Sequence, residues 1–144
     1  MVQREAGWSR EEIYYISERA HHLYRQGRFD DAGILFEGLT AIDPENVYCR
    51  KALAAVYMAL KEYGIALRHL TAFLSRDRFD AEALAGRCEA LIAMKDLAAA
   101  GRDLQLLSAL PAGFENSRRL RLLLDQAELA PGPRSQQLPH GHSR

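Results

Sequence analysis

Two pairs of histidines are the residues of this sequence that most invite a metal-binding interpretation. His21 and His22 are adjacent, and His140 and His142 flank a glycine near the end of the chain. Neighbouring residues of a helix point about 100° apart, so His21 and His22 cannot bind one ion together. The second pair has no third ligand beside it, whereas a zinc site takes at least three protein ligands. We therefore expect no metal ion and no other cofactor.

Carboxylate and thiol chemistry is not favoured by the pattern either. Asp30 and Asp31 resemble an acid/base pair, but they open an expected helix, where carboxylates are stabilised by the positive end of the helix dipole. Cys88 lies within a helical pattern and is expected to be a small core residue rather than a nucleophile. The sequence has no glycine-rich phosphate loop and no nucleophile motif. It therefore predicts a protein without catalytic activity.

The charge distribution argues against nucleic acids and membranes as partners. The chain has 19 basic and 19 acidic residues, so no large field of one sign attracts phosphates or anionic lipids. Arg118, Arg119 and Arg121 could contact phosphates, but their alternation with leucines is typical of the solvated face of a helix. No apolar run approaches the roughly 20 residues that span a bilayer. The first residues contain no apolar signal core, and Cys49 and Cys88 do not suggest a disulfide framework, so we expect a cytoplasmic protein.

The sequence repeats with a period of 34 residues, which Ala32, Ala66 and Ala100 follow. The same shift aligns five further columns: Phe29, Tyr63 and Leu97; Phe36, Leu70 and Leu104; Leu39, Phe73 and Leu107; Leu23, Tyr57 and Leu91; and Ala20, Ala54 and Cys88. So many aligned columns are hard to obtain by chance, and they indicate a repeat protein. Small residues in the alanine columns allow two antiparallel helices to approach closely, as for Ala20 against Ala32.

This period and these columns resemble the tetratricopeptide repeat (TPR), a helix-turn-helix unit. The best match is residues 24–32 (YRQGRFDDA), followed by Phe36, Leu39 and the sequence Ile-Asp-Pro at 42–44. The resemblance implies an all-α fold, with three repeats in a short right-handed solenoid and a C-terminal capping helix. Arg19 and Arg87 depart from the family pattern, which usually has leucine there, and Arg78 replaces the closing proline of the second repeat.

Capping signals place the individual helices. Ser9 and Glu12 form a capping box, so the first helix is expected from residue 10 to about 27. Asp43 and Pro44 are expected to open the third helix, and Asp80 to cap the fifth. The other helices are expected at about 30–42, 63–76, 81–94, 97–109 and 115–129. The expected organisation is a lead-in at 1–9, three repeats within 10–110 (13–46, 47–80 and 81–110), a capping helix within 111–129, and a disordered tail at 130–144.

The first helix of each repeat lines the concave face of a TPR array, so helical spacing selects a candidate groove for a protein segment. The candidate residues are Tyr14, Ser17, His21, Tyr24, Arg25, Tyr48, Lys51, Ala55, Met58, Ala59, Glu82, Ala85, Glu89 and Ile92. Tyrosine and methionine suit apolar pockets for an extended segment, and Tyr24, Tyr48 and Met58 are the hypothesised anchors. The alternative is that some of these side chains only cover neighbouring helices.

The chain is further similar to the class II translocator chaperones of bacterial type III secretion, on residues 24–39 and, more loosely, on 62–67, 87–91 and 96–100. This resemblance implies a holdase that keeps a secreted protein soluble by binding an extended segment, and it also allows a homodimer. TPR receptors for chaperone C-terminal tails bind carboxylates with basic and amide side chains, but the corresponding residues here are Ser17, His21, Ala52, Glu82 and Gly86. A TPR scaffold or adaptor within a multiprotein complex remains the alternative function.

Overall fold

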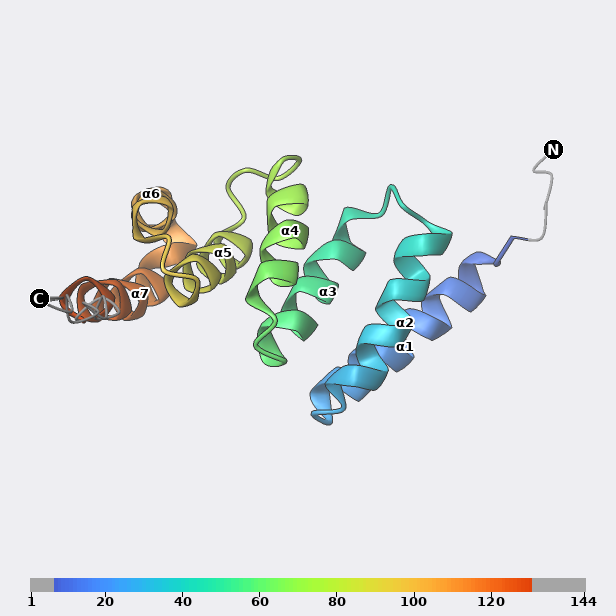
Figure 1. The fold of residues 1–144 in the computed structure, drawn as a ribbon. Helices are drawn as coiled ribbons and strands as arrows, with labels where there is room; N and C mark the ends of the chain where they lie inside the picture. Colours follow the sequence, from blue (N-terminus) through green and yellow to red (C-terminus); the bar gives the residue numbers. More distant parts are fainter. Residues whose placement is uncertain (1–6, 131–144) are drawn as a thin grey trace, which may run out of the picture.

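The structure, a computed structural model, describes residues 7–130, and within that range it contains helices and no strand. The helices are α1 (Arg10–Arg25), α2 (Phe29–Ile42), α3 (Val47–Ala59), α4 (Tyr63–Leu74), α5 (Ala81–Ala93), α6 (Leu97–Ser108), a 3-10 turn η1 (Pro111–Gly113) and α7 (Phe114–Leu129). Successive helices form hairpins that stack into an elongated array, with α7 at its end (Figure 1). His140, His142 and the expected tail beyond Ala130 lie outside the described residues.

The expected N-terminal caps of two helices are confirmed. The backbone N–H of Glu12 donates to Ser9 Oγ at 3.1 Å, and the N–H of Ser9 donates to the Glu12 carboxylate at 2.6 Å. Asp80 caps α5 by accepting a hydrogen bond from the N–H of Ala83 at 2.8 Å. Each cap satisfies a backbone donor that the first helical turn leaves free, and so fixes where its helix begins.

The third helix begins later than the sequence predicts. Asp43 and Pro44 were expected to open it, but α3 starts at Val47 with Asn46 as its N-cap. The Asn46 side chain accepts a hydrogen bond from the N–H of Tyr48 at 3.1 Å, and the Asn46 N–H donates to the Asp43 carbonyl at 3.1 Å. Residues 43–46 therefore form a β-turn, in which aspartate and proline are favoured at the first two positions. The same dipeptide thus serves a turn or a helix start, and Asn46 decides between them.

The turn inside each hairpin repeats with the period of the sequence. Gly27, Lys61 and Lys95 have positive φ angles of 77°, 60° and 66°. Each donates its N–H to the carbonyl three residues earlier, and the next residue donates to the carbonyl five residues before it. This pair of hydrogen bonds is the Schellman motif, which ends a helix through one left-handed residue. Glycine occupies that position only in the first repeat. In the second and third repeats a lysine adopts the left-handed conformation, which costs a residue with a Cβ atom about 1 kcal/mol.

Four of the six repeated columns are buried in every repeat and form the core of the molecule. Ala20, Ala32, Ala54 and Ala66 have no exposed surface, and neither do Cys88 and Ala100. Phe36 and Leu39 pack with Leu53 and Val56 of α3, so the second helix of repeat one contacts the first helix of repeat two. The helix α3 also contributes Ala54 to a second cluster that includes α4 to α7. Because α3 belongs to both clusters, the stack is continuous from α1 to α7.

Candidate functional site

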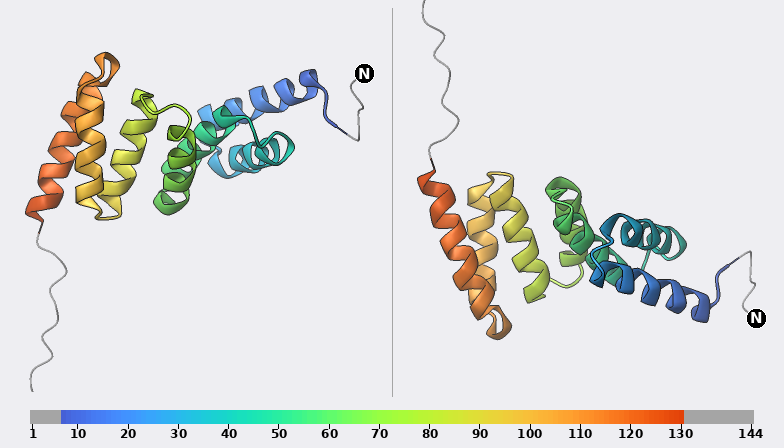
Figure 2. Two further views of the ribbon diagram at one scale, coloured as in Figure 1. Left: turned by 90° about the horizontal axis from the view of Figure 1, so that it is seen from above. Right: turned by 90° about the horizontal axis from the view of Figure 1, so that it is seen from below.

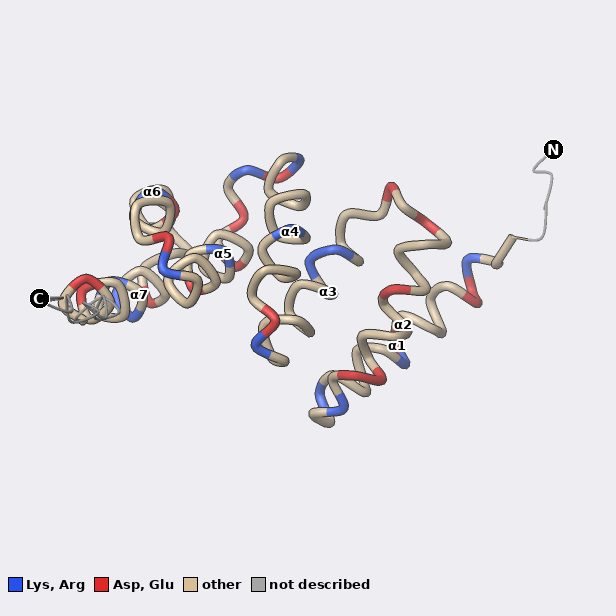
Figure 3. The backbone as a smooth tube through the Cα atoms, viewed as in Figure 1, with Lys and Arg blue, Asp and Glu red and all other residues tan. Residues whose placement is uncertain are grey.

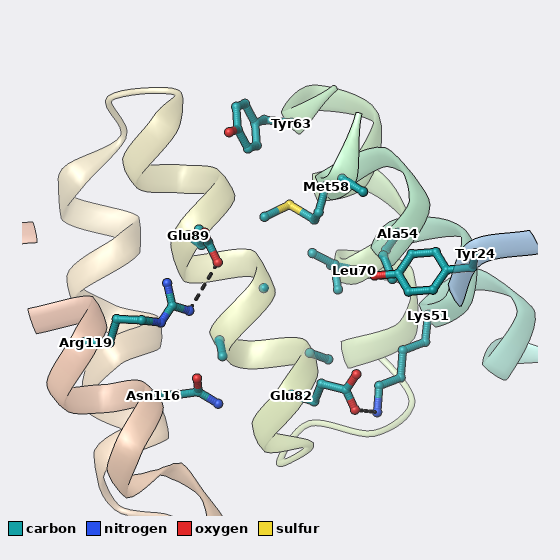
Figure 4. A pocket seen from close by; sticks show the side chains of 15 residues that line it. Tyr24, Lys51, Ala54, Met58, Tyr63, Leu70, Glu82, Glu89, Asn116 and Arg119 are labelled. Carbon is teal, nitrogen blue, oxygen red and sulfur yellow. Dashed lines mark hydrogen bonds and ion pairs between the residues drawn. The ribbon is translucent and has the colours of Figure 1, made fainter. Parts of the chain in front are cut away.

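Two adjoining hollows form one groove along the first helices of the repeats. One hollow has a volume of about 400 Å³ and lies between α1, α2 and α3, reaching Glu82 of α5. The other has a volume of about 380 Å³ and extends from Tyr24 across α3 and α5 to α7 (Figure 4). Both are lined by Tyr24, Lys51, Ala55 and Glu82. The groove therefore runs across all three hairpins and ends at the final helix.

The floor of the groove is made of small and aliphatic side chains. Ala54 and Ala55 of α3 and Ala85 and Gly86 of α5 leave the space open. A Cβ atom added at Gly86 would lie 3.4 Å from Leu70 Cδ1, so α4 approaches α5 closely beneath the groove. Small residues thus allow the helices to pack and also deepen the surface between them. Such a floor can accept the apolar side chains of another chain.

Aromatic side chains border the groove where the first two repeats meet. Tyr48 is 73% exposed, and its ring lies 6.2 Å from the ring of Phe73 in an edge-to-face contact. Tyr24 and Phe29 make a similar contact at 5.3 Å. The exposed Tyr48 and the partly buried Tyr24, each held by a neighbouring ring, present rigid apolar surface with a hydroxyl group at the edge, a combination common at protein interfaces.

Lys51 is held by two carboxylates at the middle of the groove. Its ammonium group lies 3.1 Å from Asp80 and 3.0 Å from Glu82, and 5.4 Å from the centre of the Phe73 ring. Burial acts to lower the pKa of Lys51, but the hydrogen bonds to Glu82 and Asp80 outweigh it, so the pKa is raised. The lysine remains charged and already has its partners. It is thus poorly placed to bind a carboxylate of another molecule.

The final helix contributes the far wall of the groove. Arg119 of α7 bonds to Glu89 of α5 at 3.3 Å, and Asn116 of α7 lies beside this pair (Figure 4). Arg118, Arg119 and Arg121 are exposed, as expected for a solvated face, and Arg119 also borders the groove. Helical spacing within a repeat gave no signal for these residues, because only the docking of α7 on α5 brings them here.

The structure brings most of the sequence-selected groove residues together. Those that line the two hollows are His21, Tyr24, Tyr48, Lys51, Ala55, Met58, Ala59, Glu82, Ala85 and Glu89. Sequence reasoning omitted other lining residues: Phe36, Ala52, Ala54, Tyr63, Leu70, Ala83, Gly86, Asn116 and Arg119. Ala52 and Gly86 belong to the clamp positions of the TPR resemblance, which gave a signal for them.

Four selected residues do not line the groove. Tyr14 and Ser17 lie on the N-terminal half of α1, which extends away from α3 (Figure 2). Arg25 is the last residue of α1 and is exposed. Ile92 packs against the core between α5 and its neighbours. For all fourteen candidate groove residues selected from the sequence, a role in binding stays a prediction.

The two histidines of α1 and the cysteine that were considered for metal binding or catalysis pack against neighbouring residues of the fold. His21 makes an edge contact with the Phe36 ring at 5.0 Å, and His22 lies 3.0 Å from the Gln26 amide. Within residues 7–130 no three histidine, cysteine, aspartate or glutamate side chains cluster as metal ligands would. Cys88 Sγ contacts the Ala100 carbonyl at 3.4 Å, and burial raises the pKa of its thiol to about 11. Its packing agrees with the expected core role.

The surface carries both signs of charge throughout. Basic and acidic residues are mixed along the whole array (Figure 3). The helices that the structure describes include none with the length and apolar character required to cross a membrane.

The chain is similar in fold to solved TPR structures, although no family model and no curated protein sequence matches it. PcrH from Pseudomonas aeruginosa superposes with a TM-score of 0.71 at 21% identity, covering 88% of this chain and 99% of that one. The Yersinia enterocolitica type III secretion chaperone SycD, in complex with a peptide of the translocator YopD, gives 0.72 at 22%, with coverages of 84% and 95%. The first TPR of Spaghetti (RPAP3), bound to the HSP90 peptide SRMEEVD, gives 0.73 at 24%, with coverages of 85% and 97%. This protein therefore has the all-α solenoid fold of the TPR proteins and, as its sequence indicated, resembles the type III secretion translocator chaperones among them.

Proposed function

We propose that this protein is a non-catalytic chaperone of the cytoplasm that holds an extended segment of a secreted translocator or effector in its groove. The observation that carries this proposal is the continuous groove from α1 to α7, with an apolar floor and aromatic borders. A chain seated there would cover apolar side chains that otherwise drive aggregation. Burial contributes about 25 cal/mol for each Å² of apolar surface removed from water.

The solved relatives in fold support the kind of partner. PcrH has been solved with the chaperone binding regions of PopB and PopD, and SycD with a peptide of the translocator YopD. The RPAP3 structure contains an acidic HSP90 peptide instead. Because Lys51 is already paired with Asp80 and Glu82, we favour a segment of a translocator as the partner over a peptide rich in carboxylates.

Co-expression with a candidate translocator, chosen from the neighbouring genes of the native host, tests the proposal. Tyr24→Glu, Tyr48→Glu and Met58→Glu are each expected to abolish co-purification, because a carboxylate in the groove would oppose an apolar segment. Ile34→Glu is the matched control, since Ile34 is 69% exposed on α2 and lies outside both hollows. Circular dichroism should stay helical for all four variants. If all three groove variants still bound the client, the client segment would not bind in the groove, and the proposal would be wrong.

The second candidate function is a scaffold that joins two folded proteins. The similarity to a TPR domain of RPAP3, solved with a peptide of HSP90, supports a partner other than a secreted protein. Solubility of the client separates the two. A holdase raises the soluble fraction of its client on co-expression, whereas a scaffold leaves this fraction unchanged.

A further inference from the structure

A second groove opens on the other side of α5 from the groove that runs from α1 to α7, which we now call the inner groove. It consists of two adjoining hollows of about 450 Å³ and 370 Å³, which share Thr71, Arg87 and Leu106 and which we call the outer groove. The helix α5 contacts both α4 and α6, whose side chains wall the outer groove (Figure 1). Glu89 of α5 lines the inner groove, whereas Arg87 and Leu91, each two residues away and so about 200° around the helix, line the outer one. The two grooves therefore face in opposite directions.

The middle of the outer groove is aliphatic. Leu74 of α4 and Leu91 of α5 are buried, at 4% and 7% exposure, and form part of its floor. Leu106 of α6 lines both hollows and is 44% exposed. An apolar side chain that covers Leu106 would remove apolar surface of both molecules from water, which favours binding.

Arginines stand at the two ends of the outer groove. Arg102 of α6 lines only the larger hollow and Arg78, which follows α4, lines only the smaller one, and both are exposed. Among residues 7–130 neither of them forms an ion pair. Arg87, which lies between them, is bound to Asp103 at 2.7 Å, so this pair adds no net charge. The outer groove thus carries two uncompensated positive charges, one on each side of Leu106.

The inner groove has no such excess of charge. Its cations Lys51 and Arg119 are paired with Glu82 at 3.0 Å and with Glu89 at 3.3 Å. The whole chain has equal numbers of basic and acidic residues, so the positive charge of the outer groove is a local feature. By charge complementarity the outer groove selects a partner with carboxylates.

We propose that the outer groove binds an acidic segment of a second protein, in which an apolar side chain lies between carboxylates. The apolar side chain contacts Leu106, and the carboxylates pair with Arg78 and Arg102, since a guanidinium group can bind a carboxylate through two hydrogen bonds. Nucleic acids fit less well, because their binding depends on contacts to many phosphates and the middle of the outer groove is aliphatic. This site does not depend on the proposed function, since a client in the inner groove leaves the outer groove open.

Fluorescence anisotropy with a labelled peptide, Glu-Asp-Leu-Leu-Glu-Asp, and the full chain tests the proposal. The dissociation constant should be below about 1 mM. Arg78→Glu and Arg102→Glu should each raise it about fivefold or more, because each replaces an attraction by a repulsion. Leu106→Asp should weaken binding as well. The double variant Arg78→Glu with Arg102→Glu should instead bind a peptide in which lysine replaces every acid, which the wild type should not bind.

Two control variants separate this site from other surfaces. Arg25→Glu makes the same change of charge at an exposed residue of α1 outside the outer groove and should leave the affinity for the acidic peptide unchanged. Tyr48→Glu, which is expected to abolish client binding, should leave it unchanged too, so a failure of the proposed function is told apart from a failure of this site. Circular dichroism should be the same for all variants, because the altered side chains are exposed.

Three results would overturn the proposal. The first is a wild type that does not bind the acidic peptide below about 1 mM. The second is an affinity that Arg78→Glu and Arg102→Glu leave unchanged, or that Arg25→Glu lowers equally. The third is tighter binding of an oligothymidine than of the peptide at the same salt concentration, with loss of that binding in the double variant, which would assign the outer groove to nucleic acid.

Discussion

Arg87 of α5 holds Asp103 of α6 through two hydrogen bonds, from Nε to Oδ2 at 2.8 Å and from Nη2 to Oδ1 at 2.7 Å. Asp103 is only 3% exposed. The arginine stands where the TPR pattern usually has leucine and where the second repeat has Leu53. The departure from the pattern is therefore matched by an acid on the opposing helix, and the third hairpin is joined by an ion pair at this position.

Loss of Arg87 should destabilise the protein more than loss of the whole pair. Arg87→Leu leaves the Asp103 carboxylate buried without its cation, which costs about 3–5 kcal/mol. Arg87→Leu with Asp103→Leu removes both charges and should cost far less, since apolar replacements of a buried pair are often neutral. Urea unfolding followed by circular dichroism measures both values. A double variant as unstable as the single one would contradict this account.

Glycine at the left-handed turn positions should stabilise the second and third hairpins. Lys61→Gly and Lys95→Gly relieve a conformation that costs a residue with a Cβ atom about 1 kcal/mol, less the entropy that glycine loses on folding. We expect a gain of about 0.5 kcal/mol at each site. Lys61→Ala is the control, because it removes the same charge but keeps the Cβ atom. Equal thermal midpoints for the alanine and glycine variants would refute the conformational explanation.

Gly113 should be required for the docking of α7. A Cβ atom added there would collide with the carbonyl oxygen of Leu107, a backbone atom that cannot rotate away. Gly113→Ala is expected to lower the free energy of unfolding by about 1–3 kcal/mol through the shift it forces between α6 and α7. Gly101→Ala is the matched control, because open space surrounds Gly101 on α6. Amide hydrogen exchange should show faster exchange in α7 of the first variant alone.

Mild acid should weaken the packing of α4 against α3 within the second hairpin. Burial lowers the pKa of His69, whose ring stacks on Tyr57 at 5.8 Å and whose Nδ1 has no hydrogen-bond partner among the described residues. The unfolded chain therefore binds a proton more readily, so the contribution of His69 is complete above the ordinary histidine pKa and declines as the pH falls below about 6.5.

The variant His69→Leu should reduce this dependence of stability on pH. Leucine is the residue at the equivalent position of repeat one, Leu35. The measurement is the urea midpoint at a series of pH values between about 7.5 and 5. Parallel curves for the variant and the wild type would exclude His69 as the source. The Tyr57 hydroxyl donates to the Glu37 carboxylate at 2.6 Å, and this bond raises the pKa of Tyr57 to about 12, so the hydroxyl stays protonated across this range.

Local sequence signals predicted the helices well where one residue type has one structural use. The Ser9 capping box and the Asp80 cap lie where they were expected. The predicted start of α3 was wrong by about one helical turn, because Asp43 and Pro44 suit a β-turn as well as a helix start. Lys61 and Lys95 carried no signal for a left-handed turn, since their conformation is imposed by the helices on either side.

The sequence by itself determined the repeat, the buried columns and the position of most groove residues, because burial at a fixed period reflects contacts that every hairpin makes in the same way. Only the tertiary structure decided that Asn116 and Arg119 complete the groove and that Ile92 packs into the core. It alone paired Arg87 with Asp103 and left Phe114, Leu122 and Leu129 of α7 exposed. These features depend on how one helix is rotated against the next, and a residue spacing within one helix does not contain that rotation.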